Sequence, residues 1–388
     1  MTGGSKIGVG IVGTGFAAAA HAEALRRVPG VELVAVAGSS AVKAREFADA
    51  WESVRAHEGW RELLDDEAVA VVHVCTPNHL HAEINSAAIA AGKHVLSEKP
   101  LALDSGETRA LVRESESADV VAGVCFNYRH FPLVRELKAR LEASGRPHQI
   151  RGGYLQDWLL HESDWNWRLE PEKGGSARAM GDIGSHWLDL VQHVTGDEVV
   201  SVCARVGSLH AERLRPSTPG QTFAQGAGDA ERVGVETEDF GSVLLHLAGG
   251  CTGAFSVSQA SAGRKNRLTL EIDTAEASFA WDQEEPNRLW IGRRDGPNEE
   301  LVRDPALLGP GAASLTHYPG GHQEGWPDAL RNLCEDFYAA VAARQAGRPY
   351  EPTFATFAEA HRTTQIAEAI LASDRSDRWV EVEEVRVR

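Results

Sequence analysis

The feature that constrains the fold most is the start of the chain, where an apolar run ends in a glycine turn. Residues 6–12 form the run, Gly13-Thr14-Gly15 follow, and an alanine-rich segment with helical character comes next. A strand, a tight glycine turn and a helix form the context of a dinucleotide-binding fingerprint. Gly13 permits the turn, Gly15 lets the backbone approach a pyrophosphate, and Ala18 takes the helix-packing position. Alone this signal is weak, because glycine turns also close ordinary strand–helix loops.

The next hundred residues repeat the alternation of strand and helix. Further strand-like apolar runs lie at 31–37, 69–75, 94–97 and 120–125, with helical segments between them at 41–50, 79–91 and 105–117. Strands that alternate with helices predict a doubly wound parallel sheet. We therefore assign residues 1–126 to an NAD(P)-binding Rossmann domain of the α/β class.

The end of the second predicted strand bears on the choice of cofactor. NAD-binding domains usually carry an acidic residue there, which binds the adenine ribose. This chain has Gly38-Ser39-Ser40 instead, with Lys43 nearby. Serine hydroxyls and a cation suit a 2′-phosphate, so the sequence favours NADP slightly over NAD. The alternative is that Ser39 or Ser40 caps the next helix.

Two more loops follow strands at the same edge of the predicted sheet. Asn78, after the third strand, caps a helix or contacts the nicotinamide ribose, and both roles are compatible. Lys99, after the fourth strand, is held out of helical geometry by Pro100. It can point into the crevice, donate to an alcohol oxygen and stabilise negative charge as a proton leaves. The alternative is a surface lysine paired with Glu98.

From Gln149 onward the pattern changes to long alternating runs, at 149–158, 199–208, 235–247, 251–258, 268–272, 278–281 and 288–291. Such alternation predicts an open-faced, mostly antiparallel sheet. Residues 213–229 and 303–326 are predicted as long surface loops, and 326–346 and 357–373 as helices. We assign residues 127–388 to a second domain of the α+β class.

A pattern of acids and histidines stands out in this second domain. Asp182, His186, Asp189 and His193 are spaced by four, three and four residues, so on a helix they share one face. A carboxylate one turn from an imidazole orients the ring and fixes which nitrogen carries the proton. A general base that acts on a hydroxyl needs this arrangement. The alternatives are a helix N-cap for Asp182 and a hydrogen-bonded, half-buried histidine for His186.

Tryptophans and acids are interleaved just upstream of that pattern. Asp157 and Trp158 are adjacent, and Trp165 lies in a run of aromatic, acidic and basic residues at 164–168. Aromatic rings cover the C–H faces of a polyol, and carboxylates accept its hydroxyl hydrogen bonds. The alternative is tryptophan in a core or a subunit interface. His322, in a glycine-rich stretch, is a candidate to lie over the same pocket.

Composition excludes several classes of partner. The formal net charge is -17, from 39 basic and 56 acidic residues, which argues against nucleic acids and anionic membranes. No apolar run approaches the ~20 residues that a membrane span requires. Five scattered cysteines indicate buried free thiols in a reducing, cytoplasmic setting. No C-x-x-C or H-E-x-x-H spacing suggests a metal site.

Four motifs together resemble the Gfo/Idh/MocA oxidoreductase family over nearly the whole chain: the glycine turn, Glu98-Lys99-Pro100, Tyr128-Arg129, and Gly174-Gly175 leading to Asp182, His186 and Asp189. This family combines a Rossmann domain with an open-faced sheet domain that often forms homodimers or homotetramers. Its members mostly oxidise or reduce a secondary hydroxyl of a sugar or cyclitol with NAD(P). The segment 157–189 is similar to the levoglucosan dehydrogenase-like and related sugar 3-dehydrogenase branch.

The motifs and the resemblance together predict the site. The resemblance implies catalysis by Lys99 and His186 with Asp182 beside them, and no metal. The expected cofactor contacts are Gly13, Gly15, Phe16, Ala17, Ser39, Ser40, Lys43, Thr76, Asn78, His81, Glu98, Lys99, Asn127 and Arg168. The expected contacts with a small polyhydroxylated substrate are Tyr128, Asp157, Trp158, Trp165, Asp182, His186 and His322.

Two other functions remain open for this sequence. Some relatives of the fold use transient hydride removal, with tightly held NAD, to cleave glycosidic bonds. A non-catalytic nucleotide-sensing protein on a Rossmann domain is the other alternative, because fold alone does not fix function. A sensing protein has no need of the lysine and the histidine, and Lys99 and His186 are both present.

Overall fold

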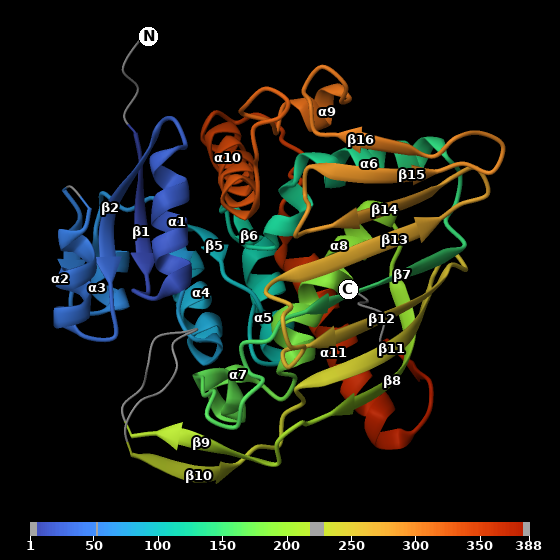
Figure 1. Cartoon of the computed structure of the whole chain (residues 1–388). Helices are drawn as coiled ribbons and strands as arrows, with labels where there is room; N and C mark the ends of the chain where they lie inside the picture. The colour runs from blue at the N-terminus through green and yellow to red at the C-terminus, as the bar shows by residue number, and fades with distance from the viewer. Residues whose placement is uncertain (1–5, 52, 218–228, 383–388) are drawn as a thin grey trace. The chain divides into compact units, whose positions relative to one another are not determined.

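The computed structural model describes residues 6–51, 53–217 and 229–382 and divides the chain into two compact units (Figure 1). The first unit is Met1–Asn127 with Pro327–His361, and the second is Tyr128–Trp326 with Arg362–Arg388. The first predicted boundary lies one residue from this division. The predicted second domain of 127–388 differs from it, because Pro327–His361 belongs to the first unit.

A seven-stranded sheet forms the centre of the first unit, in the order β17-β6-β5-β4-β1-β2-β3. Its strands are β1 (Ile7–Val12), β2 (Val31–Ala37), β3 (Arg55–His57), β4 (Val71–Val74), β5 (His94–Ser97), β6 (Ala122–Val124) and β17 (Ala355–Thr356). All pairs are parallel except β17 with β6. The strand order reverses beside β1, so the crevice for a ligand lies at the carboxyl ends there. The predicted doubly wound parallel sheet is confirmed.

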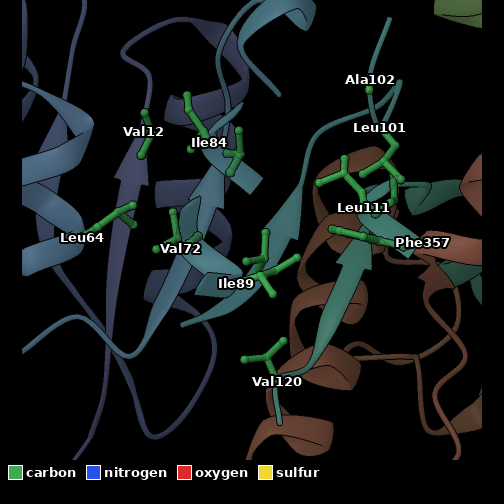
Figure 2. Close-up of a cluster of buried hydrophobic side chains, with 14 of the residues drawn as sticks. Val12, Leu64, Val72, Ile84, Ile89, Leu101, Ala102, Leu111, Val120 and Phe357 are labelled. Atoms are coloured by element: carbon green, nitrogen blue, oxygen red, sulfur yellow. The ribbon is translucent and has the colours of Figure 1, made fainter. Parts of the chain in front are cut away.

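Helices pack on this sheet through aliphatic side chains (Figure 2). The helices of the first unit are α1 (Phe16–Arg26), α2 (Ala41–Asp49), α3 (Trp60–Asp65), η1 (Asn78–Leu80), α4 (His81–Ala90), α5 (Ser105–Ser117) and α10 (Trp326–Gln345). Figure 2 shows Val72 of β4 in one buried cluster with Ile84 and Ile89 of α4 and Leu111 of α5. This core fixes the positions at which the strands end.

The second unit is built on a nine-stranded sheet in the order β16-β15-β14-β13-β7-β12-β11-β8-β18. Its strands are β7 (Gln149–Leu155), β8 (Val199–Gly207), β11 (Phe240–Leu247), β12 (Thr252–Ser258), β13 (Arg267–Asp273), β14 (Ser278–Asp282), β15 (Arg288–Gly292), β16 (Glu299–Val302) and β18 (Val380–Glu381). Only the pair β7–β12 is parallel. The predicted, mostly antiparallel sheet is confirmed.

Helices cover one face of this sheet, and the other face stays open (Figure 1). The helical segments of the second unit are η2 (Asn127–His130), α6 (Pro132–Ala143), η3 (Trp167–Leu169), α7 (Pro171–Gly174), η4 (Met180–Gly184), α8 (Ser185–Thr195), α9 (Pro310–Ala313) and α11 (Phe357–Ser376). The first residue of η2 and the first five residues of α11 belong to the first unit. Trp187 of α8 stacks on Phe255 of β12 with ring centroids 4.4 Å apart. Gly152 of β7 allows this approach, because a Cβ there would lie 2.7 Å from Trp187 Nε1.

The two predicted loops contain regular structure. β9 (Glu212–Pro216) pairs with β10 (Ala230–Gly234), so the loop prediction is wrong for residues 213–216, while 218–228 lie outside the described residues. Charged side chains pair across this ribbon, for example Arg215 with Glu231, where Arg215 Nη2 lies 2.7 Å from Glu231 Oε2. The sequence of the two strands therefore has no apolar alternation that would indicate a strand. The predicted loop at 303–326 includes α9. Within the described ranges, no helix has the length and apolar character to cross a bilayer.

Candidate active site

The glycine turn has the geometry that a pyrophosphate cradle needs. Gly13 has φ +129°, and a Cβ there would lie 2.4 Å from the carbonyl oxygen of Cys75. Gly15 precedes α1, and the space where its Cβ would point is open. Backbone N–H groups at the start of α1 are therefore accessible to an anion. Phe16 and Ala17, both predicted cofactor contacts, form the first residues of that helix.

Two buried polar atoms at the same sheet edge fit a bound dinucleotide. Thr76 Oγ1, after β4, and Asn127 Nδ2, after β6, are buried without a hydrogen-bond partner among the described residues. Buried polar groups are normally hydrogen-bonded, so such atoms call for a ligand or water. Both residues were predicted cofactor contacts. The groups present in this unit therefore fit a nicotinamide dinucleotide.

Of the two serines after β2, Ser40 has a local partner. Ser40 is the N-cap of α2, and its Oγ accepts a 3.4 Å hydrogen bond from the Lys43 amide. The capping alternative therefore holds for Ser40. Ser39 is exposed beside it. Asn78 is buried at the start of η1, whose N-cap position belongs to Pro77.

Lys99 lies in the turn that follows β5. The Lys99-Pro100 peptide bond is cis. Glu98 accepts from the Lys99 amide at 3.2 Å through Oε2, and its Oε1 lies 3.0 Å from His21 Nε2. Burial raises the pKa of Glu98, but the His21 hydrogen bond and the charges of His21 and Lys99 outweigh it and bring that pKa to about 2.

His81, a predicted cofactor contact, connects two loops at this edge. It is fully buried, with Nδ1 2.7 Å from the Pro100 oxygen and Nε2 2.8 Å from the Thr76 oxygen. Burial lowers its pKa, although the two carbonyls and the Glu98 charge oppose that effect. His81 therefore fixes the loop after β4 against the cis turn. Its contact with a cofactor stays a prediction.

Asp182 lies in the wide π-turn η4, which runs directly into α8. Its Oδ2 accepts a 2.8 Å hydrogen bond from Gln259 Nε2, and its Oδ1 lies 3.3 Å from Arg168 Nε. The N-cap position of α8 belongs to Gly184, so Asp182 is not the helix cap. π-turns often occur at functional sites. Arg168, predicted to contact the cofactor, lies against this carboxylate.

A buried network fixes the orientation of the Gln259 amide. Arg178 Nη1 donates to Gln259 Oε1 at 2.9 Å, which leaves the amide nitrogen to donate to Asp182. Arg178 is itself held by Asp239, which also accepts from Arg213 at 2.7 Å. The side chains of both arginines and of Asp239 are 0% exposed. Asp182 is thus connected to a rigid, fully buried charge cluster.

His186 lies in the first turn of α8, beside two tyrosines. Its ring is 4.8 Å from that of Tyr128, edge to face, and 6.1 Å from that of Tyr154. The Tyr128 and Tyr154 hydroxyls are 2.6 Å apart, Tyr154 donates to Asn266 Oδ1 at 2.5 Å, and Asn266 Nδ2 donates to Tyr128 at 3.1 Å. Burial raises the pKa of Tyr128 to about 12, with a further contribution from Asp182. Both phenols therefore keep their protons.

The parallel pair β7–β12 explains why these groups meet. Leu155 and Ser258 end the two strands in register, so Gln156 and Gln259 follow at one edge of the sheet. Gln156 Nε2 donates to Asn266 at 3.0 Å and its Oε1 accepts from Trp158 Nε1 at 2.9 Å. Four residues of this group were not predicted from the sequence, namely Tyr154, Gln156, Gln259 and Asn266. Their only signal is their position at strand ends, which becomes informative once the parallel pairing is known.

The other predicted substrate contacts have partners of their own. Asp157 accepts from Lys265 Nζ at 2.7 Å and from the Gly263 amide at 3.0 Å. Trp158 and Trp165 are half-buried and pack on a small apolar cluster. Trp165 also lines a cavity of about 660 Å³ bounded by Trp167, Lys173 and Arg215, among others. His322 is exposed, and its carbonyl accepts from Arg303.

Asp189 and His193 have structural surroundings. Asp189 forms a two-point ion pair with Arg129 of η2, at 2.8 and 2.5 Å, with both side chains nearly inaccessible. Burial, with the Arg129 charge, lowers the pKa of His193 and keeps it neutral. Its Nε2 is among the buried atoms without a hydrogen-bond partner in the described part of the chain. Of the four residues on the predicted face, Asp182 and His186 remain candidates for acid–base chemistry.

Comparison with known proteins identifies the family. Residues 7–126 match the family model of the Gfo/Idh/MocA oxidoreductases with an NAD-binding Rossmann fold, and residues 134–280 match the Gfo/Idh/MocA C-terminal domain. The chain is 30% identical to the levoglucosan dehydrogenase of Pseudarthrobacter phenanthrenivorans, over 98% of this chain and 99% of that protein. The chain belongs to the Gfo/Idh/MocA oxidoreductase family.

Solved structures are similar to the chain over nearly its whole length. An oxidoreductase domain protein from Kribbella flavida has 30% identity and a TM-score of 0.87, covering 98% of this chain and 100% of that one. Levoglucosan dehydrogenase in complex with NADH and levoglucosan has 29% identity and a TM-score of 0.86, with the same coverage. The chain is thus an oxidoreductase with an NAD-binding Rossmann domain, and the predicted likeness to the levoglucosan dehydrogenase branch is confirmed.

The Arg129–Asp189 pair leads to a prediction about stability. Arg129→Met leaves the Asp189 carboxylate buried without its counter-ion, and breaking a buried pair in this way costs about 3–5 kcal/mol. We expect the free energy of unfolding in urea to fall by that amount. In the double variant Arg129→Met with Asp189→Leu no charge remains, so much of the loss should be recovered. A single variant as stable as the wild type would contradict this structural role.

Proposed function

We propose that the chain is an NAD(P)-dependent dehydrogenase that reversibly oxidises a secondary hydroxyl of a sugar, anhydrosugar, glycoside or cyclitol. The observation that carries this proposal is the strand-end cluster of uncharged hydroxyl and amide groups around His186, whose ring lies 4.8 Å from that of Tyr128, with the Asp182 carboxylate held at the same sheet edge by Gln259. Uncharged donors and acceptors suit the hydroxyls of a polyol. The full-length likeness to a levoglucosan dehydrogenase supports the same substrate class.

The proposed roles follow from the chemistry of each group. When bound, the nicotinamide supplies the hydride acceptor, as usual for this cofactor. His186 takes the hydroxyl proton as general base, and Asp182 orients its ring. Lys99 donates to the substrate oxygen and stabilises the negative charge that develops there. Tyr128, Asn266 and their neighbours hold the ring hydroxyls that do not react.

The His186→Ala variant tests this assignment. Losing a general base typically lowers the rate by about 10²–10⁴. We expect that loss in kcat, with the Kd for NAD unchanged, in an assay of reduced nicotinamide with levoglucosan, glucose, inositols and aryl glycosides. His193→Leu is the matched control, because this neutral imidazole lies two turns further along α8 and its Nε2 has no hydrogen-bond partner among the residues that the structure describes. It should keep its turnover.

Three outcomes of this assay separate the alternatives. A His186→Ala variant as active as the wild type would remove the general-base assignment. Cleaved glycoside with no net formation of NADH would favour the glycosidic-bond-cleaving alternative. NAD binding without turnover of any substrate in the panel would favour a nucleotide-sensing protein.

We further propose that the enzyme accepts NADP as well as NAD, with a slight preference for NADP. Ser39 is exposed at the end of β2, and Lys43 lies on the first turn of α2. Both can approach a 2′-phosphate. The observation that supports this is the absence of an acid at residues 38–40 in the sequence.

Introducing the missing acid tests the cofactor proposal. In Ser39→Asp a new carboxylate repels the 2′-phosphate and can bind the ribose hydroxyls of NAD. We expect the KM ratio of NADP to NAD to rise about tenfold or more, equal to about 1.4 kcal/mol. Lys43→Gln should raise the KM for NADP and leave that for NAD unchanged. Equal changes for the two cofactors in both variants would refute a 2′-phosphate site here.

We also propose that the open face of the nine-stranded sheet forms a homodimer or homotetramer. Phe240 and Leu244 on β11 are 42% and 52% exposed on this face, and Trp290 on β15 is 38% exposed. Exposed large apolar side chains on a sheet face are typical of protein interfaces, and these three are spread over the face from β11 to β15. The four buried free cysteines support the predicted reducing, cytoplasmic setting.

Leu244→Lys tests the interface. A charge at the centre of an apolar contact is expected to dissociate the oligomer, which light scattering on a sizing column measures as a fall to the protomer mass of 41.9 kDa. Val42→Lys is the control, because Val42 is 62% exposed on α2 of the other unit. A wild-type protein that already elutes as a protomer would rule out the proposed interface.

A further inference from the structure

A row of four polar side chains lies behind the Lys99 turn in the first unit. Tyr338 Oη lies 2.8 Å from His73 Nε2, His73 Nδ1 lies 2.8 Å from His21 Nδ1, and His21 Nε2 lies 3.0 Å from Glu98 Oε1. They come from α10, β4, α1 and the turn after β5. Both imidazoles are 0% exposed. The mechanism proposed above gives this row no role.

The positions of the protons in this row follow from the hydrogen-bonding capacity of its groups. An ionised Glu98 can only accept, so His21 Nε2 carries a hydrogen and donates it to Oε1. Burial, with the charge of His21, lowers the pKa of His73 well below its ordinary value and keeps that ring neutral. A neutral ring has one N–H, so the two Nδ1 atoms share one proton. Both imidazoles are thereby fixed at both nitrogens.

The same contacts account for a set of potential metal ligands. His21, Glu98 and Cys125 bring one ligand atom each within 4.8 Å of one another, among the described residues. His21 Nε2 already donates to Glu98, and Cys125 forms a side-chain hydrogen bond with the same carboxylate. Burial raises the pKa of the Cys125 thiol, which keeps its proton. Hydrogen bonds therefore satisfy this cluster with no ion.

The carboxylate of Glu98 transmits the position of His21 to Lys99. Oε1 is bound by the imidazole and Oε2 accepts from the Lys99 amide at 3.2 Å, so one rigid group spans both. The groups that face Glu98 are His21 from α1, His81 from α4, Cys75 after β4, Cys125 after β6, Cys334 from α10 and the adjacent Lys99. Raised pKa values keep the thiols of Cys75, Cys125 and Cys334 protonated, and a thiol is a weak hydrogen-bond donor. The His21 N–H, 3.0 Å from Oε1, is therefore the main side-chain donor to this carboxylate.

We propose that His21 is a positioning residue for Lys99, acting through Glu98, with His73 and Tyr338 holding the imidazole in place. The inference rests on the proposed role of Lys99 as the residue that stabilises charge on the substrate oxygen. The His21–Glu98 contact adds a second anchor to the turn, besides the contact of His81 with the Pro100 carbonyl. A lysine displaced by about 1 Å can lose about 10² in rate.

Two amide variants of His21 separate positioning from general structural support. A glutamine amide reaches the place of an imidazole Nε2, so His21→Gln can still donate to Glu98. An asparagine amide reaches only the place of Nδ1, so His21→Asn keeps the His73 side and loses Glu98. We expect kcat to fall by about 10² in His21→Asn and to stay near the wild-type value in His21→Gln. The Kd for NAD, measured by calorimetry, should be the same in both.

Controls make the result decisive. His94→Asn changes another buried histidine, at the amino end of β5, where the asparagine oxygen can replace Nδ1 as acceptor of the Val121 amide bond. It should keep full turnover. Tyr338→Phe keeps the ring and loses only the hydroxyl bond to His73, so it should lower kcat several-fold even if His21→Asn does not fold. Lys99→Met is measured alongside and should abolish most of the turnover.

Different results of these measurements would overturn different parts of the proposal. Unchanged kcat in His21→Asn and Tyr338→Phe, equal losses in the Asn and Gln variants, or a loss matched by weaker NAD binding would each overturn the proposal. Stoichiometric zinc in the purified enzyme, lost in Cys125→Ser, would overturn the hydrogen-bond account of the cluster. Full activity of Lys99→Met would show instead that the proposed function is wrong, whatever His21 does.

Discussion

One parallel pairing in an antiparallel sheet determines where the second unit places its chemistry. β7 and β12 run in the same direction, so both carboxyl ends reach one edge, and β13 begins there. Gln156 and Gln259 directly follow the two carboxyl ends, and Asn266 directly precedes the start of β13. The intervening chain returns through η4 and α8, which carry Asp182 and His186 to the same edge. With antiparallel pairing at this position, the two glutamines would lie at opposite ends of the sheet.

Three carboxylates show how burial and partner decide the role of one functional group. Asp189 meets an arginine fork and is a structural ion pair. Glu98 accepts from an imidazole and from a backbone amide, and its pKa of about 2 keeps it ionised beside Lys99. Asp182 accepts from an amide whose orientation is fixed by Arg178, while its side chain remains 12% exposed. Of these three, it alone is anchored to the strand-end amides of the nine-stranded sheet.

Much of the fold was predictable because apolar periodicity is a local property. The bounds of β2, β5 and α5 follow directly from their sequences. The spacing of Asp182 and His186 predicted one helical face, whereas the structure places Asp182 in the π-turn η4 ahead of α8. The return of Pro327–His361 to the first unit was not predictable, since a helical pattern does not say which sheet it packs on. Nor were Gln259 and Asn266, because an isolated amide gains its role only from a strand pairing that joins distant segments.

The hydrogen-bond network beside His186 also restricts the kind of ligand that this part of the site can bind. Tyr128, Tyr154 and Asn266 close a ring of hydrogen bonds in which each hydroxyl both donates and accepts. A ligand that opens this ring must replace a donor and an acceptor together, or a buried polar group is left unpaired at a cost of about 1–3 kcal/mol. A hydroxyl provides both functions, whereas an ionised phosphate provides only acceptors. With neutral phenols and amides lining it, this part of the site is suited to an uncharged polyol.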